Sequence, residues 1–208
     1  MNRLFGMRTY LVGAMDRVPD GGVVWRENLT TFLNTLGVVV FNPCNKPLKD
    51  NDSLAFETAE AREVRNKAKQ QGDLKKAANC MKPIRATDLR MVDISDFLIA
   101  NIDMEVHACG TYEEIFTANR QRKPILIHVE GGKANTPDWL LSVIGEKAVD
   151  DMIFNDWDEL KQYLITVNEA NDYVINSLNK HKRWVFFDLE KITSDAMRRG
   201  DFWRKMKK

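Results

Sequence analysis

Glu114, in the segment 110–115 with the sequence GTYEEI, has the carboxylate that most strongly suggests a chemical role. Thr111 and Glu114 have the T-x-x-E spacing of a capping box, in which the two side chains close the N-terminus of a helix. The same carboxylate could instead be a nucleophile, because Asp and Glu side chains attack anomeric carbons and form covalent glycosyl-enzymes. A helix N-terminus would keep it ionised at neutral pH. The two interpretations compete for the same oxygen atoms.

Two further residues could assist such a nucleophile, although each also has an ordinary structural interpretation. Asp88 lies on a predicted helix, where it could simply be a solvated residue beside an apolar stripe. Tyr10 lies in a predicted strand, where a tyrosine is most often part of the core with its hydroxyl at an edge. Both remain candidates because reactive groups in parallel sheets gather near the carboxyl ends of the strands.

An anion could be held at the turn 16–22, DRVPDGG, which follows the first predicted strand. Backbone N–H groups at a helix start, together with Arg17 or Arg26, are suited to binding a phosphate. Alternatively, the two glycines only form a turn and Arg26 lies on the surface. Neither GxxxxGK[ST] nor GxGxxG follows this strand, so no phosphate-binding loop of those types is predicted.

The cysteines and histidines favour neither a metal site nor a Cys–His nucleophile. Cys44, Cys80 and Cys109 form an odd set without CxxC spacing, which argues against a disulfide framework and a structural zinc site and indicates a reducing compartment. His107 is close to Cys109 in sequence, but a nucleophilic pair needs a facing geometry that proximity alone does not supply. We expect His128, inside the apolar run ILIHV, to be a hydrogen-bonded core residue.

Alternating apolar strands and amphipathic helices position these residues. We predict strands within the ranges 9–15, 38–42, 96–102, 124–129 and 151–155. We predict helices at 23–36, in a charged insertion at 53–78 that breaks near Gly72, after Pro83, and at 110–121, 139–144 and 157–178. Continuous β-branched runs are typical of parallel strands buried on both faces. The expected fold is a flavodoxin-like, doubly wound α/β fold with a five-stranded parallel sheet of order 2-1-3-4-5.

The composition fits one sizeable domain. The chain has 208 residues, is 44% hydrophobic and has a net charge of +1, so stable nucleic-acid binding is not expected. Its apolar runs are too short for a signal sequence or a membrane span, which predicts a cytoplasmic protein with no membrane association. We expect an α/β domain over 1–178 and a C-terminal appendage over 179–208. The aromatic residues of this appendage suggest packing on a neighbouring subunit, and hence a homo-oligomer.

Several of these residues together resemble the nucleoside 2-deoxyribosyltransferases and their relatives that hydrolyse 2-deoxynucleoside 5-monophosphates. The family's first strand carries an aromatic residue followed by a glycine, matched here by Tyr10 and Gly13. Its Gly-x-x-x-Glu signature, on a helix that ends near Arg-Lys-Pro, is matched by 110–114 and by 122–124, so Glu114 takes the nucleophile's position. Asp88 matches an aspartate on the preceding helix. The resemblance covers roughly residues 8–129.

The resemblance implies a two-step reaction on a small-molecule nucleoside or nucleotide, with no metal or organic cofactor. Glu114 attacks the anomeric carbon while Tyr10 orients it, and Asp88 protonates or holds the base, directly or through water. A second free base, or water, then attacks the glycosyl-enzyme. The substrate-binding residues expected from the resemblance and from the positions above are Gly13, Asp16, Arg17, Arg26, Asp103, Cys109, Gly110 and Thr111.

Two departures from the family pattern leave alternatives open. Ala108 stands where transferases often carry an aspartate, so the group that contacts the sugar is either supplied by Asp103, Glu105 or another subunit, or missing. Cys109 stands where related enzymes often have serine for phosphate recognition, which favours a transferase over a hydrolase of deoxynucleoside 5-monophosphates. A different class of protein, a non-catalytic nucleotide-binding module, is also an alternative. A flavin-binding relative is a further one, although the first loop lacks a hydroxyl-rich phosphate cradle.

Overall fold

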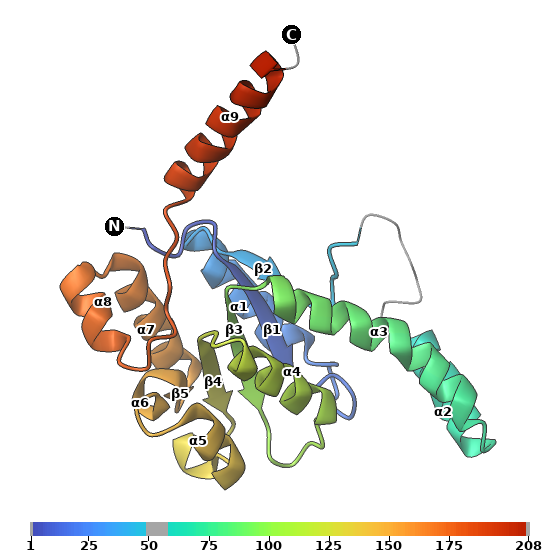
Figure 1. The fold of residues 1–208 in the computed structure, drawn as a ribbon. Helices are drawn as coiled ribbons and strands as arrows, with labels where there is room; N and C mark the ends of the chain where they lie inside the picture. Colours follow the sequence, from blue (N-terminus) through green and yellow to red (C-terminus); the bar gives the residue numbers. More distant parts are fainter. Residues whose placement is uncertain (1, 49–57, 207–208) are drawn as a thin grey trace.

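A five-stranded, all-parallel sheet forms the centre of the protein, as the computed structural model of residues 2–48 and 58–206 shows (Figure 1). The strands are β1 (Arg8–Gly13), β2 (Val39–Phe41), β3 (Phe97–Ile102), β4 (Ile125–Val129) and β5 (Ile153–Phe154). Their order is β2-β1-β3-β4-β5, and each neighbouring pair is parallel. The predicted flavodoxin-like order is therefore confirmed. The strand order reverses between β1 and β3, which brings the ends of these two strands to the switch point where such folds bind ligands.

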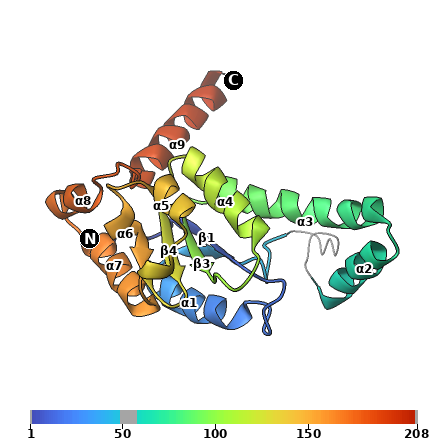
Figure 2. The same ribbon diagram turned by 90° about the horizontal axis from the view of Figure 1, so that it is seen from below.

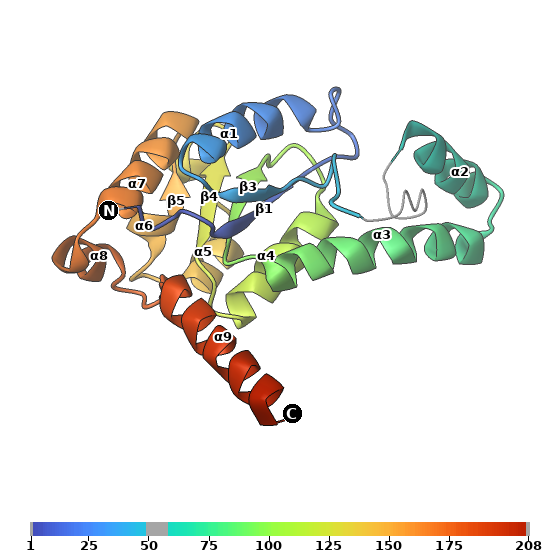
Figure 3. The ribbon, with the colours of Figure 1, turned by 90° about the horizontal axis from the view of Figure 1, so that it is seen from above.

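Helices cover both faces of this sheet. They are α1 (Val23–Thr35), α2 (Ala59–Gln70), α3 (Leu74–Ile94), α4 (Cys109–Arg120), α5 (Asp138–Ile144), α6 (Val149–Met152), α7 (Trp157–Glu169), α8 (Asp172–Leu178) and α9 (Leu189–Met206), with a 3-10 turn at Lys133–Asn135. Helices α1 and α7 lie on one face, and α4 with the C-terminal part of α3 lies on the other (Figures 2 and 3). The α2–α3 hairpin extends to one side of the body (Figure 3).

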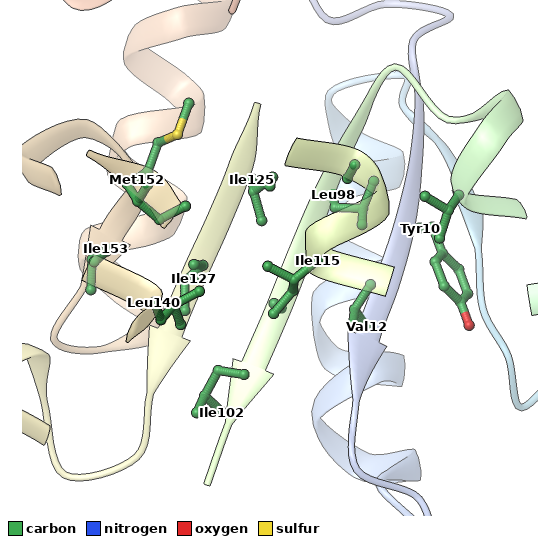
Figure 4. Close-up of a cluster of buried hydrophobic side chains, with 14 of the residues drawn as sticks. Tyr10, Val12, Leu98, Ile102, Ile115, Ile125, Ile127, Leu140, Met152 and Ile153 are labelled. Carbon is green, nitrogen blue, oxygen red and sulfur yellow. The ribbon is translucent and has the colours of Figure 1, made fainter. Parts of the chain in front are cut away.

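The face covered by α3 to α6 holds one of two apolar clusters. Alternate strand residues such as Val12 and Leu98 pack there against Ile115 of α4 and Leu140 of α5 (Figure 4). Tyr10 lies at the edge of this cluster, and its hydroxyl points away from the other labelled side chains. Its ring is therefore part of the core while its polar end is available to a neighbouring site.

The opposite face contains a stack of three rings. Trp25 of α1 stacks on Trp157 of α7 with ring centroids 5.2 Å apart, and Trp157 stacks on the His128 ring at 4.2 Å. The His128 Nδ1 atom lies 2.7 Å from the side-chain oxygen of Asn101. The prediction of a hydrogen-bonded core histidine is confirmed, since His128 is buried.

Helix α3 is longer than the sequence suggested. Pro83 was expected to start a helix, but it lies inside a single helix of 21 residues. A proline lacks the N–H that would continue the hydrogen-bond ladder, yet packing on α2 and α4 holds the two parts of α3 in line. The predicted break at Gly72 is confirmed, because this residue has φ +75° between α2 and α3. Residues 53–57 of the predicted insertion lie outside the described ranges.

The C-terminal third also differs from the expectation. The single helix predicted over 157–178 is two helices, because Ala170 is extended and the Asn171 side chain accepts a hydrogen bond from the Val174 N–H at 2.9 Å, which caps α8. The short helix α6, which was not predicted, precedes β5 and shortens that strand to two residues. The sequence predicted one helix because the apolar spacing of α7 continues through α8. The cap that separates the two helices is a polar residue, which a search for apolar spacing does not detect.

The first residues after α8 belong to the α/β body. Trp184 is buried in the cluster that contains Phe97, and its indole N–H donates to the Tyr163 hydroxyl at 3.0 Å. Arg183 donates to the side-chain oxygen of Asn119 at 2.7 Å. Helix α9, in contrast, extends away from the body (Figure 1). Among the described residues no helix is long and apolar enough to cross a membrane.

Candidate active site

Three elements bring Tyr10, Asp88 and Glu114 to one place. Strand β1 supplies Tyr10, the C-terminal part of α3 supplies Asp88, and the second turn of α4 supplies Glu114. The Tyr10 hydroxyl donates a hydrogen bond to Oε1 of Glu114 at 3.0 Å. The same hydroxyl is also a hydrogen-bond neighbour of Asp88 that lowers the pKa of this carboxyl. Tyr10 therefore interacts with both carboxyl groups.

The start of α4 decides between the two interpretations of Glu114. The helix begins at Cys109 with Ala108 as its N-cap, and no side chain accepts a hydrogen bond from the first turn. Thr111 is therefore inside the helix, and Glu114 is its sixth residue, too far along to cap it. The capping-box interpretation is wrong, and the Glu114 carboxyl is available to the cavity.

A lysine that the sequence did not indicate completes the group. The side chain of Lys46, in the segment after β2, is fully buried, and its Nζ lies 2.6 Å from Oδ1 of Asp88. The turn that carries it is fixed by a hydrogen bond from the Cys44 N–H to the side-chain oxygen of Asn42 at 2.9 Å. A buried ammonium group needs such a partner, because removing a charge from water is costly.

Burial and the neighbouring charges shift the pKa values of both carboxyl groups. Burial and the negative charge of Asp88 raise the pKa of Glu114 to about 8, despite the hydrogen bond from Tyr10. Burial also raises the pKa of Asp88, but Lys46 and Tyr10 oppose this increase. Burial raises the pKa of Tyr10 well above its usual value, so its hydroxyl keeps its proton. At neutral pH Glu114 therefore holds a proton, while Asp88 lies beside the ammonium group of Lys46.

The expectation that a helix N-terminus keeps Glu114 ionised is therefore wrong for this structure. The helix dipole acts mainly within the first turn, and Glu114 lies beyond it. Glu114 keeps some exposure to the cavity, but protein surrounds most of its carboxyl group. Desolvation disfavours the charged form and exceeds the effect of the nearby cations.

The carboxyl groups face a cavity of about 590 Å³. This volume lies within the range of about 300–1,000 Å³ that is typical of small-molecule sites. Its wall includes the end of β1, the first turn of α4, one face of α3 and part of α2. Of the predicted substrate-binding residues, those that line it are Gly13, Asp16, Arg17, Cys109, Gly110 and Thr111.

Gly13 and Asp16 have identifiable roles in forming this wall. A Cβ atom on Gly13 would lie 3.0 Å from Cζ2 of Trp25 and 3.2 Å from the carbonyl oxygen of Asn101, so the close packing there favours glycine. Asp16 pairs with Arg62 of α2 at 2.9 Å. This ion pair joins the loop after β1 to the α2–α3 hairpin.

Arg26 does not have the predicted role in binding an anion. Its side chain is completely buried and is not among the described residues that line the cavity. The guanidinium donates to the carbonyl oxygens of Leu11, Gly13 and Gly22 at 3.2, 2.8 and 2.7 Å and stacks on the Trp25 ring. Arg26 therefore fixes the end of β1 and the following turn from inside, by supplying donors to three backbone carbonyls.

Asp103 also lies elsewhere than predicted. It lines a neighbouring hollow beside Tyr112 and Phe116 rather than the cavity of Glu114, and its Oδ1 accepts a hydrogen bond from the Glu105 N–H at 2.9 Å. This local turn holds the aspartate away from the other carboxyl groups. Ala108, at the position where a helper aspartate was expected, does line the cavity and contributes only a methyl group.

Two functional candidates were missed at the sequence level. Lys46 follows the second strand, and the rule that strand ends carry functional groups would have indicated it. Arg65 occupies an inward position of α2, between Ala61 and Ala68 at helical spacing, and lines the cavity. The sequence could have indicated it, because Arg65 shares one face of a highly charged helix with two small alanines.

No family model matches the sequence, and no curated protein does. The chain is similar to solved structures, which include the following two. A 2-deoxyribosyltransferase from Bacillus psychrosaccharolyticus is 15% identical, with a TM-score of 0.48 over 81% of this chain and 95% of the other. A CMP N-glycosidase from Clostridium botulinum is 19% identical, with a TM-score of 0.40 over 76% of this chain and 97% of the other.

Proposed function

We propose that the protein cleaves the N-glycosidic bond of nucleosides or nucleotides, with Glu114 as the nucleophile, and transfers the sugar to another base. The observation that carries the proposal is the hydrogen bond from the Tyr10 hydroxyl to Glu114 beside Asp88, in a cavity at the carboxyl ends of β1 and β3. A pair of carboxyl groups placed together suits the nucleophile and acid roles of glycosidic bond cleavage. The sequence resemblance supports the same chemistry.

The reaction begins with movement of a proton within the site. Glu114 holds a proton at neutral pH, whereas a nucleophile must be ionised. The Tyr10 hydroxyl can accept the proton of Glu114 and pass its own proton to Asp88, so that no phenolate accumulates. Glu114 is then a carboxylate, and Asp88 is an acid.

The covalent step uses this second proton arrangement. An oxygen of Glu114 forms a bond to the anomeric carbon as the bond from that carbon to the base nitrogen breaks. The base leaves with the electron pair and takes the proton of Asp88. A second base then attacks the anomeric carbon, returns a proton to Asp88 and releases Glu114 as a carboxylate. Lys46 stabilises Asp88 whenever it is ionised.

The test is incubation with deoxynucleosides and deoxynucleoside monophosphates, with and without a second free base. Exchange of bases is expected. Release of free base and sugar without exchange would instead assign a hydrolase, and no release with any substrate would favour a nucleotide-binding module.

The nucleophile is tested by trapping with a 2-fluoro-2-deoxynucleoside, followed by mass spectrometry. An adduct on Glu114 is expected, and Glu114→Gln should abolish both the adduct and base release. Glu113→Gln is the matched control, because the adjacent Glu113 pairs with Arg85 at the protein surface. An adduct elsewhere, or base release that survives Glu114→Gln, would overturn the assignment.

A further inference from the structure

Arg65 is a buried cation that lines the cavity, and among the described residues it has no carboxylate in an ion pair with it. Only 6% of its surface is exposed, and its Nη1 atom is buried without a hydrogen-bond partner among residues 2–48 and 58–206. Buried polar atoms in proteins are nearly always hydrogen-bonded, so such an atom at a cavity wall indicates an acceptor that comes from a ligand. The planar guanidinium group suits phosphate and carboxylate oxygens in particular.

Three other cations at or near the cavity have carboxylate partners. Lys46 is paired with Asp88, Arg62 with Asp16, and Arg85 with Glu113. Lys69 lies one turn after Arg65 on α2 and also lines the cavity, as does Arg17. The α2 end of the cavity therefore has positive charge that the carboxylates of its wall do not neutralise.

The position of α2 relates this charge to the reaction site. The ion pair between Arg62 and Asp16 fixes α2 beside the loop after β1, and Arg65 lies one turn further along the same helix. The cavity also extends along α3 from Asp88 to Ala77, which at 1.5 Å per residue is about 16 Å. It is therefore long enough to hold the glycosidic bond near Glu114 and a second group near α2.

We propose that Arg65, assisted by Lys69, binds a phosphate group of the substrate, which is a nucleoside 5-phosphate. The nucleoside part of this ligand is inferred from the proposed function. The phosphate part is inferred only from the position and burial of Arg65. A nucleoside without phosphate would leave the α2 end of the cavity empty. The distance between the nucleoside and the α2 end of the cavity determines how many phosphate groups the ligand carries.

Binding is tested by calorimetry on full-length Glu114→Gln protein, which does not turn the ligand over. The probes are a deoxynucleoside and its 5-mono-, di- and triphosphates. We expect at least one phosphorylated form to bind ten-fold or more tightly than the nucleoside. Arg65→Met in this background should remove that preference and leave nucleoside binding unchanged. Arg65→Lys should retain part of it, because the charge remains while the planar donor pair is lost.

Lys67→Met is the matched control, since Lys67 is an exposed residue of α2 that pairs with Glu63. It should bind all four probes like the parent protein. Should Arg65→Met fail to fold, as judged by circular dichroism, Lys69→Met provides the second variant and should weaken only phosphorylated probes. Equal binding of nucleoside and nucleotides, or an equal loss for both in Arg65→Met, would overturn the phosphate site.

The two proposals can fail separately. Arg65-dependent nucleotide binding by a protein that releases no base would support the phosphate site and reject the enzyme. Base release from nucleosides and nucleotides with equal kcat/KM, in wild-type protein and Arg65→Met alike, would support the enzyme and reject the phosphate site.

Discussion

At the scale of single residues, the main feature is a pair of carboxyl groups in unlike surroundings. Glu114 keeps a proton because of burial and the charge of Asp88, whereas the buried Lys46 stabilises Asp88 as an anion. The sequence placed Glu114, Asp88 and Tyr10 in one site through a family resemblance. It could not give their protonation, because that depends on how deeply the fold buries each group.

The raised pKa of Glu114 predicts that the protein loses stability as pH rises. Below about pH 4.5 the carboxyl is protonated in both states, and between about 4.5 and 8 only the unfolded state releases the proton. Relative to Glu114→Gln, the free energy of unfolding should therefore fall by up to about 1.4 kcal/mol per pH unit in this interval, less where cavity water screens the charge. Urea unfolding at pH 5, 6, 7 and 8 measures it.

Glu113→Gln should show no such change between pH 5 and 8, and a change of the opposite sign when the unfolding series is extended below pH 4.5. Arg85 lowers the pKa of Glu113, so its contribution to stability is present above its ordinary pKa and is lost as the pH falls. A stability difference between wild type and Glu114→Gln that does not change with pH would show that Glu114 has an ordinary pKa.

Tyr10→Phe keeps the buried ring but removes the hydroxyl that contacts Glu114. The variant should fold, and kcat/KM for base release should fall about 10- to 100-fold, as expected for loss of a hydrogen bond to a charged group. The upper pKa of the pH–rate profile should also rise, since the hydroxyl lowers the pKa of Glu114. Tyr112→Phe is the control, because Tyr112 packs against Phe116 on the outer side of α4. An unchanged profile in Tyr10→Phe would remove Tyr10 from the mechanism.

Lys46→Met tests the buried ion pair. Removing the ammonium leaves Asp88 without its partner, and breaking such a pair costs about 3–5 kcal/mol. The double variant Lys46→Met/Asp88→Asn should recover most of this loss, because no unpaired charge remains. Urea unfolding of the two single variants and the double variant measures the coupling. Losses that simply add would show that the two side chains do not interact.

At the scale of elements, the sequence predicted strands better than helix ends. Apolar runs identified all five strands because parallel strands are buried on both faces. The helix breaks depended on single polar residues. Pro83 was expected to begin a helix but lies inside α3, and Asn171 divides a pattern that looked continuous. Such boundaries depend on local hydrogen bonds and tertiary packing, which periodicity does not show.

The cap of α8 provides a test at this scale. Asn171→Ala removes the oxygen that accepts the Val174 N–H and should destabilise the protein by about 1 kcal/mol. Asn171→Asp, which keeps a capping oxygen, should be close to wild type. Thermal unfolding of the three proteins makes the comparison. Equal losses in both variants would mean that the amide group rather than the cap matters.

At the scale of the whole molecule, the predicted appendage divides into two parts. Residues up to Phe186 pack on the α/β body, whereas α9 extends from it with Ile192, Met197 and Met206 exposed. The aromatic composition of the tail suggested packing but could not separate the two parts. We propose that the α/β domain ends near residue 188 and that α9 is the appendage, whose apolar side chains favour contact with another subunit.

Truncation distinguishes these parts. A protein that ends at Asp188 should fold and keep its cavity, with a melting temperature close to that of the full chain. A protein that ends at Leu178 loses buried Trp184 and should be destabilised by about 3 kcal/mol or more. Circular dichroism melting compares them. A large loss of stability in both truncated proteins would show that α9 is part of the body.

The stacked rings behind the sheet have an optical consequence. Two indoles as close as those of Trp25 and Trp157 couple their excited states, which gives the folded protein a near-ultraviolet circular dichroism signal that neither tryptophan has alone. Gly13 borders the cavity on one side and Trp25 on the other. A molecule that enters beside Gly13 therefore disturbs one member of the coupled pair, so the protein carries an intrinsic spectroscopic reporter of its own cavity.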